Sequence, residues 1–125
     1  MVKYKARITL IGPLVSEFMD HGILVLFGAN APEELKEFAV IHDGQELVEP
    51  IVAGDTVTIG QAAFRVLAVG DIVNKNLAAL GHLVLKCNGQ TKPEMPGDVC
   101  LEQKPFPYIE VGTKLIVAQQ VNGSK

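Results

Sequence analysis

The fold is indicated first by an alternating stretch near the start of the chain, Lys3-Tyr4-Lys5-Ala6-Arg7-Ile8-Thr9-Leu10. A period of two places every second side chain on the same face of an extended strand. A second stretch, Ile23 to Phe27, is a short continuous apolar run that is typical of a buried strand. Period two dominates over the helical period of 3.6, so we predict a mainly all-β protein.

Further strands are expected after glycine-containing turns. Gly54, Gly97 and Gly112 each stand shortly before an apolar run, and these runs are Val57-Thr58-Ile59, Val99-Cys100-Leu101 and Leu115-Ile116-Val117. Regularly spaced strands in a chain of 125 residues favour a small closed or partly closed β-barrel, which leaves few strand edges exposed. We expect a single domain over residues 1–125.

Two short helices are predicted to interrupt the strands. The first begins at Pro32, which suits the first helical position, and runs to Glu37 with acidic residues in its opening turn. The second is expected to start from an Asn74 cap and to end at Gly81, a residue that adopts the left-handed conformation without steric cost.

Composition narrows the possible functions. A net charge of −3, without a basic cluster and without Trp, argues against nucleic-acid binding. The longest apolar stretch, Gly22 to Phe27, is far too short to span a bilayer, and no leader opens the chain. Two cysteines without paired spacing suit a reducing compartment. We therefore expect a cytoplasmic protein that is not inserted in a membrane.

His42 is the main candidate for chemistry. It follows an apolar run and precedes Asp43-Gly44, a dipeptide that favours a tight hairpin turn, so we expect its ring to be reachable from solvent. A neutral imidazole can attack a phosphoryl donor and form a covalent phosphoramidate. The backbone N–H groups of Gly44 and Gln45 are candidates to contact the transferred phosphate. Taken without its context, His42 could equally be an exposed turn histidine that has no function.

His82 precedes the predicted strand Leu83 to Cys87, and strand alternation puts it on the face opposite Leu83. If it lies near His42, it can orient a phosphoryl group there. A metal site of His42, Asp43 and His82 is another possibility, although no pair has the spacing of a recognisable metal motif. His21 stays unassigned. No nucleotide-binding or serine-hydrolase motif occurs in the chain.

Several ordered stretches resemble the glucitol/sorbitol-specific IIA component family of the bacterial phosphotransferase system: Ile41-His42 with Glu46-Leu47, then Ala68-Val69-Gly70, Asn76-Leu77 and Leu80-Gly81-His82. The resemblance covers nearly the whole chain. It implies a phosphotransferase with a phosphohistidine intermediate, in which His42 is the acceptor and His82 supports it. Some similar proteins have a further histidine two positions after the acceptor, where this chain has Gly44.

The resemblance also implies partners. The histidine-containing phosphocarrier protein HPr would give its phosphoryl group to His42, and the IIB component of a hexitol permease with its IIC membrane part would receive it. No cofactor and no metal is expected, and we expect Nε2 to be the accepting nitrogen. Two alternatives stay open: a non-catalytic barrel that binds a small ligand or protein, and a metal-dependent hydrolase that uses His42, Asp43 and His82.

Overall fold

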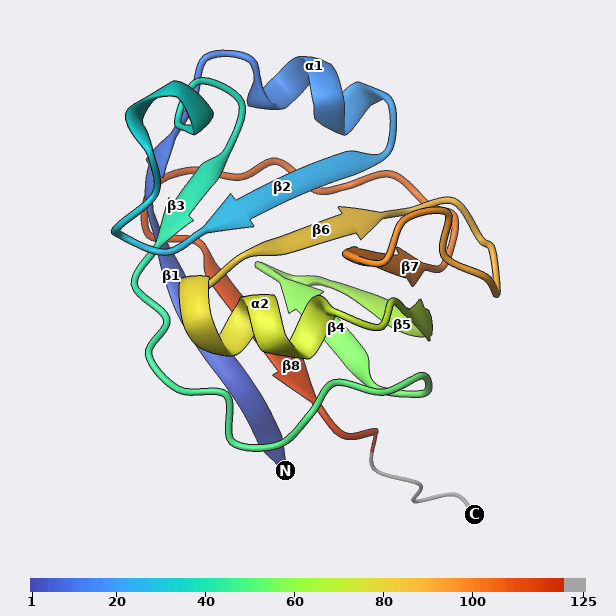
Figure 1. Ribbon diagram of the computed structural model, residues 1–125. Helices are drawn as coiled ribbons and strands as arrows, with labels where there is room; N and C mark the ends of the chain where they lie inside the picture. The colour runs from blue at the N-terminus through green and yellow to red at the C-terminus, as the bar shows by residue number, and fades with distance from the viewer. Residues whose placement is uncertain (121–125) are drawn as a thin grey trace.

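The computed structural model describes residues 1–120, in which eight strands close into one barrel (Figure 1). Around the barrel the strands follow the order β1, β3, β2, β6, β7, β5, β4, β8. This confirms the prediction of a mainly all-β closed barrel. The strands are β1 (Val2–Ile11), β2 (Ile23–Phe27), β3 (Val40–His42), β4 (Thr56–Ile59), β5 (Ala62–Val69), β6 (Leu83–Lys86), β7 (Asp98–Leu101) and β8 (Lys114–Ala118).

Strand direction brings three segments that are distant in sequence to one end of the barrel. β2 and β3 are parallel, with Phe27 opposite Ile41, so both strands end at the same place. β6 is antiparallel to β2 and pairs Leu83 with Leu26, so β6 begins where β2 ends. Figure 1 shows the heads of β2 and β3 beside the start of β6. His42 and His82 therefore lie at the same end of the barrel.

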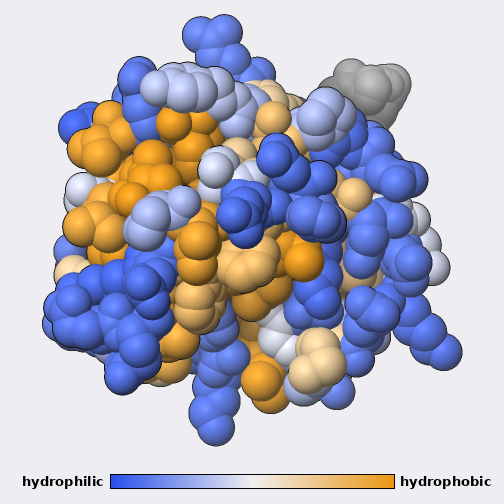
Figure 2. Space-filling view, turned by 90° about the horizontal axis from the view of Figure 1, so that it is seen from above, coloured by the Kyte–Doolittle hydropathy of each residue, from blue (hydrophilic) through white to orange (hydrophobic). Residues whose placement is uncertain are grey.

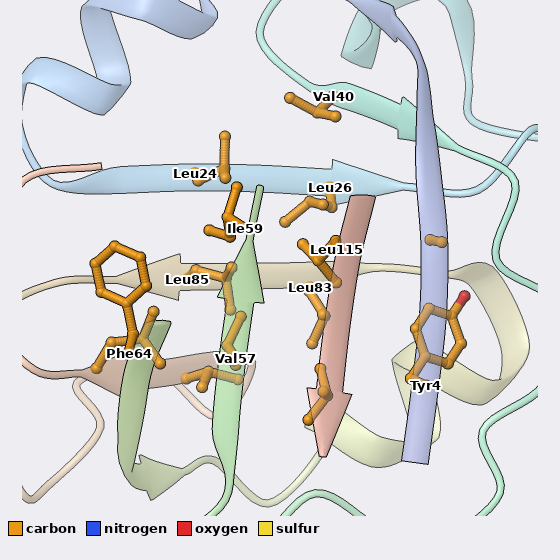
Figure 3. Packing of buried hydrophobic residues seen from close by; sticks show 14 of the residues in the cluster. Tyr4, Leu24, Leu26, Val40, Val57, Ile59, Phe64, Leu83, Leu85 and Leu115 are labelled. Atoms are coloured by element: carbon orange, nitrogen blue, oxygen red, sulfur yellow. The ribbon is translucent and has the colours of Figure 1, made fainter. Parts of the chain in front are cut away.

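The barrel interior is filled by alternate side chains of the strands, as Figure 3 shows for part of the cluster. Phe64, Val57 and Leu85 are among the residues with no exposed surface. A smaller apolar cluster lies outside the barrel wall and consists of Phe27, Ala39 and Ile41, with Val25, Ala31 and Leu35 packed against it. The two clusters sit on opposite faces of β2 and β3, because Leu26 and Val40 belong to the interior one.

Three helical segments accompany the strands: α1 (Val15–Asp20), the single 3-10 turn η1 (Glu33–Leu35) and α2 (Val73–Leu80). α1 was not predicted, and the helix expected over Pro32 to Glu37 is only one turn. α2 ends at Gly81 with φ of 65°, which confirms the predicted stop. Within residues 1–120 there is no helix whose length and apolar character would allow it to cross a membrane.

The predicted Asn74 cap is wrong. Asn74 lies inside α2, and Ile72 occupies the capping position without a side-chain hydrogen bond. The Asn74 side chain instead accepts a hydrogen bond from the backbone N–H of Ile51 at 2.7 Å and donates one to the carbonyl of Ile51 at 3.0 Å. These two bonds attach the segment between β3 and β4 to the helix, a long-range role that no local sequence rule indicates.

The predicted hairpin at Asp43-Gly44 is also wrong. The next strand, β4, begins only at Thr56 and pairs with β5 and β8, not with β3. Asp43 continues the contact with β1 instead, because its N–H donates to the carbonyl of Arg7 at 3.1 Å. Its carboxylate also accepts the Arg7 N–H at 2.7 Å. The chain therefore runs straight past Gly44 along β1 and makes no tight turn there.

Candidate functional site

His42 is the last residue of β3, and its ring points into the barrel. Only 2% of the residue is exposed, so the expectation of a solvent-reachable ring is wrong. Strand alternation explains this, because His42 shares the inner face of β3 with Val40. The ring meets Tyr4 of β1 edge to face, with centroids 5.9 Å apart.

Two hydrogen bonds determine the protonation state of the His42 ring. Nε2 lies 2.7 Å from the carbonyl oxygen of Gly81. A carbonyl only accepts, so Nε2 carries the proton and donates it. Nδ1 then holds the lone pair, and it accepts the N–H of Gly44 at 3.0 Å. The ring is held as a neutral imidazole with its nucleophilic pair on Nδ1.

The environment of the ring favours the same neutral state. Burial lowers the pKa of His42 below its ordinary value of 6.5, and the Gly81 carbonyl and the Asp43 carboxylate only partly oppose this effect. A neutral imidazole is the form that attacks a phosphoryl group, because protonation removes the lone pair. His42 therefore has the chemical form of an acceptor, while the surrounding chain covers it.

The predicted phosphate contacts at Gly44 and Gln45 are arranged differently from the expectation. The Gly44 N–H is already bound to the ring of His42. Gln45 is exposed, and its side-chain amide donates to the carbonyl of Asp43 at 3.3 Å. The expected anion-binding concavity of two free N–H groups is therefore absent from this part of the structure, because the Gly44 N–H is bound to the ring of His42.

A surface hollow of about 810 Å³ adjoins this segment. The basic side chains on its wall, Lys5, Arg7 and Lys114, were not predicted as site residues. They come from β1 and β8, and only closure of the barrel brings these strands to residues 43–46. The lining residues that matter for the site are Tyr4, Lys5, Arg7, Asp43, Gln45 and Lys114. Another hollow, of about 860 Å³, lies between α1 and residues 103–109, and its wall includes His21.

His82 lies on the other side of the barrel wall. Its ring stacks on Phe27 of the outer cluster, with centroids 4.1 Å apart and an interplanar angle of 12°. Its Nδ1 lies 3.1 Å from the carbonyl oxygen of Leu26. Gly81 connects the two histidines, since it binds the ring of His42 and precedes His82 in the chain. The supporting role of His82 at a phosphoryl group on His42 stays a prediction, which this arrangement does not favour.

The geometry offers no support for the metal alternative. Across the described part of the chain, residues 1–120, no group of three or more His, Cys, Asp or Glu side chains is placed to hold a metal ion. His82 faces away from His42, and the carboxylate of Asp43 accepts a backbone hydrogen bond from Arg7. Both cysteines are buried and free, and burial raises the pKa of the Cys87 thiol to about 12.

Comparison with solved structures indicates the class of this barrel, that of the phosphotransferase-system IIA components. A crystal structure titled as a PTS system IIA component from Enterococcus faecalis V583 matches it with a TM-score of 0.77. That match has 25% sequence identity and covers 89% of this chain and 96% of the other.

Within that class the family is more specific. The family model described as the PTS system glucitol/sorbitol-specific IIA component matches residues 3–116. The glucitol/sorbitol-specific EIIA components of Shigella flexneri and Escherichia coli (strain K12) are each 35% identical to this chain over 98 residues, which is 78% of this chain and 80% of theirs. The chain belongs to the glucitol/sorbitol-specific IIA component family of the phosphotransferase system.

Proposed function

We propose that this chain is a cytoplasmic phosphoryl carrier that accepts a phosphoryl group on His42 from HPr and passes it to the IIB component of a hexitol permease. Membership of the family supports the system in which it acts. The observation that carries the choice of His42 is its ring, which is neutral and restricted to one tautomer by the Gly81 carbonyl. Such a ring holds a nucleophilic nitrogen ready for phosphoryl transfer.

The accepting atom in this proposal is Nδ1, in place of the Nε2 expected from sequence. Nε2 bears the proton that binds Gly81, so only Nδ1 offers a lone pair. The Gly44 N–H must leave Nδ1 before a phosphorus atom can approach. Once released, the same N–H is placed to donate to a phosphoryl oxygen, which keeps Gly44 as a phosphate contact.

The hollow beside Gly44 is the proposed route for the donor. Its lining carries the positive charges of Lys5, Arg7 and Lys114 against the carboxylates of Asp43 and Glu46, and the three basic side chains attract a phosphoryl group. Asp43, Gln45 and Glu46 are exposed, so displacement of this segment uncovers few buried side chains; it breaks the two hydrogen bonds between Asp43 and Arg7 and the contact of Gly44 with Tyr4. Outward movement of residues 43–46 therefore opens Nδ1 toward a basic hollow.

The transfer itself is an exchange between two histidine nitrogens. The nitrogen–phosphorus bond of the donor breaks as the bond to Nδ1 of His42 forms, and the donor ring leaves with its lone pair. Because the donor bond is already a reactive phosphoramidate, catalysis consists mainly of alignment. The proposal uses no cofactor and no metal.

The test is incubation of the full chain with phosphoenolpyruvate, enzyme I and HPr, followed by mass spectrometry that locates phosphate along the chain. We expect acid-labile phosphate on residue 42 of the wild type and none there in His42→Gln. Glutamine keeps a donor for the Gly81 carbonyl but has no nucleophilic nitrogen. His21→Gln, at an exposed histidine, is the matched control and should be phosphorylated like the wild type. A wild type without phosphate would support the non-catalytic binding barrel.

A further inference from the structure

His82 has the features of a nucleophile that is already open to a partner. The Leu26 carbonyl only accepts, so Nδ1 of His82 carries the proton of the neutral ring. The lone pair is then on Nε2, and no hydrogen-bond partner for this atom occurs within residues 1–120. No buried side-chain nitrogen or oxygen in that range lacks a partner. Nε2 of His82 therefore reaches the surface.

The ring of His82 is also held rigidly. The ring stacks on Phe27, with centroids 4.1 Å apart, and the backbone N–H of His82 donates to the carbonyl of Asn76 in α2 at 3.3 Å. Gly81 adds a fixed left-handed turn directly before it. A nucleophile on a rigid support loses little entropy when it aligns with a phosphoryl donor.

The surroundings of His82 suit contact with another protein. Leu80, two residues before it, is 55% exposed, and Val25, Ala31 and Leu35, which pack against the buried outer cluster, are partly exposed. Figure 2 shows the face over α1 and η1, where apolar side chains reach the surface between hydrophilic ones. Apolar contact area around a reactive group is typical of a protein docking site, where the centre of the interface excludes water.

We propose that His82 is a second phosphoryl-accepting residue, which takes the group on Nε2 directly from the phosphohistidine of the phosphocarrier. The nitrogen–phosphorus bond of the donor breaks as the bond to Nε2 forms, and the donor ring leaves with its electron pair. The proton stays on Nδ1, and its hydrogen bond to the Leu26 carbonyl stabilises the phosphorylated ring. This inference rests on the proposed function for the identity of the donor, but it needs no opening of residues 43–46.

The two histidines act independently in this proposal, because their rings lie on opposite sides of the barrel wall. They are also chemically distinct, since His42 would carry phosphate on Nδ1 and His82 on Nε2. The two isomers of phosphohistidine give separate phosphorus NMR signals. Position and isomer can therefore be assigned separately to each residue.

The experiment uses the full chain as wild type, His42→Gln, His82→Asn and the double variant, each incubated with phosphoenolpyruvate, enzyme I and HPr. Asparagine at position 82 keeps a donor for the Leu26 carbonyl and lacks Nε2, although it loses the stacking on Phe27. Circular dichroism confirms folding of each variant. We expect His42→Gln to retain one acid-labile phosphate on residue 82 as the Nε2 isomer, and the double variant to gain none.

The outcomes separate this inference from the proposed function. Phosphate confined to residue 42, with His82→Asn modified as fully as the wild type, overturns the second site and leaves the proposed function intact. Phosphate confined to residue 82 supports the second site and contradicts the choice of His42. A wild type that gains no phosphate overturns both.

Discussion

His42 Nε2 donates to the carbonyl oxygen of Gly81 at 2.7 Å, which ties the end of β3 to the junction between α2 and β6. The two residues are 39 positions apart in sequence. Gly81 directly precedes the outward-facing His82, so the same backbone segment binds the ring of His42 and positions His82. Changes at Gly81, Gly44 or His42 are therefore expected to affect this end of the barrel together.

Stability should fall in mild acid because of His42. Its pKa in the folded chain is lowered from 6.5, so the unfolded chain binds more protons as the pH falls through this value. The contribution to stability is fully present above about pH 6.5 and is lost progressively toward the lower folded pKa. Urea unfolding at about pH 7.5 and about pH 5 should show this loss.

The matched variants for this pH effect are His42→Gln and His21→Gln. The former removes the buried titrating ring, so its stability should vary less between the two pH values than that of the wild type. His21→Gln removes an exposed ring whose Nδ1 lies 2.9 Å from the Glu17 carbonyl. Its stability should differ between the two pH values by as much as that of the wild type. An unchanged pH dependence in His42→Gln would contradict the assignment.

Replacement of Gly81 by alanine should destabilise the chain more than replacement of Gly54. Both glycines have positive φ, 65° and 98°, so each alanine is strained by about 1–3 kcal/mol. A Cβ at Gly81 would also lie 2.8 Å from the Gly28 nitrogen and 3.0 Å from Cε1 of His42, whereas at Gly54 it meets nothing within 4 Å. We expect a further loss of about 1–3 kcal/mol for Gly81→Ala, measured by urea unfolding. Equal losses would show that the contact does not matter.

Gly44→Ala should destabilise the barrel through Tyr4. A Cβ at Gly44 would fall within van der Waals overlap of the Tyr4 ring and hydroxyl, and Tyr4 is only 2% exposed. Forcing buried groups apart costs about 1–3 kcal/mol. Gly97→Ala is the control, because its Cβ would approach only the Asn76 side chain, at 3.9 Å. Thermal unfolding should show a clear loss for Gly44→Ala alone, and equal melting temperatures would argue against tight packing here.

The buried ion pair of Lys3 and Asp55 should be sensitive to loss of one partner. Their charged atoms lie 2.8 Å apart, and the side chains are 5% and 3% exposed. Lys3→Met leaves a buried carboxylate without its cation, which typically costs about 3–5 kcal/mol. Lys36→Met removes the pair with Glu33, whose side chain is 89% exposed, and should change stability by less than about 1 kcal/mol. Unfolding in urea compares the two, and similar losses would contradict the burial argument.

Local sequence patterns predicted the elements whose determinants are local. The run Ile23 to Phe27 is β2 residue for residue, and the stop at Gly81 ends α2 because glycine alone adopts that backbone conformation easily. α1 was missed because six residues that bury only Val15 leave too short a pattern to show a helical period. The ordered motifs around His42 and His82 led to the correct family.

The sequence by itself indicated most of the strands and the barrel class, because side-chain alternation and glycine turns act over a few residues, and it singled out His42 and His82; it did not predict β5. Only the tertiary structure decided that Asp43 pairs with β1 rather than turning, that His42 points inward, and that His82 stacks on Phe27 with Nε2 open. Each of these depends on a partner far away in the chain. Barrel closure, which no local pattern encodes, supplies those partners.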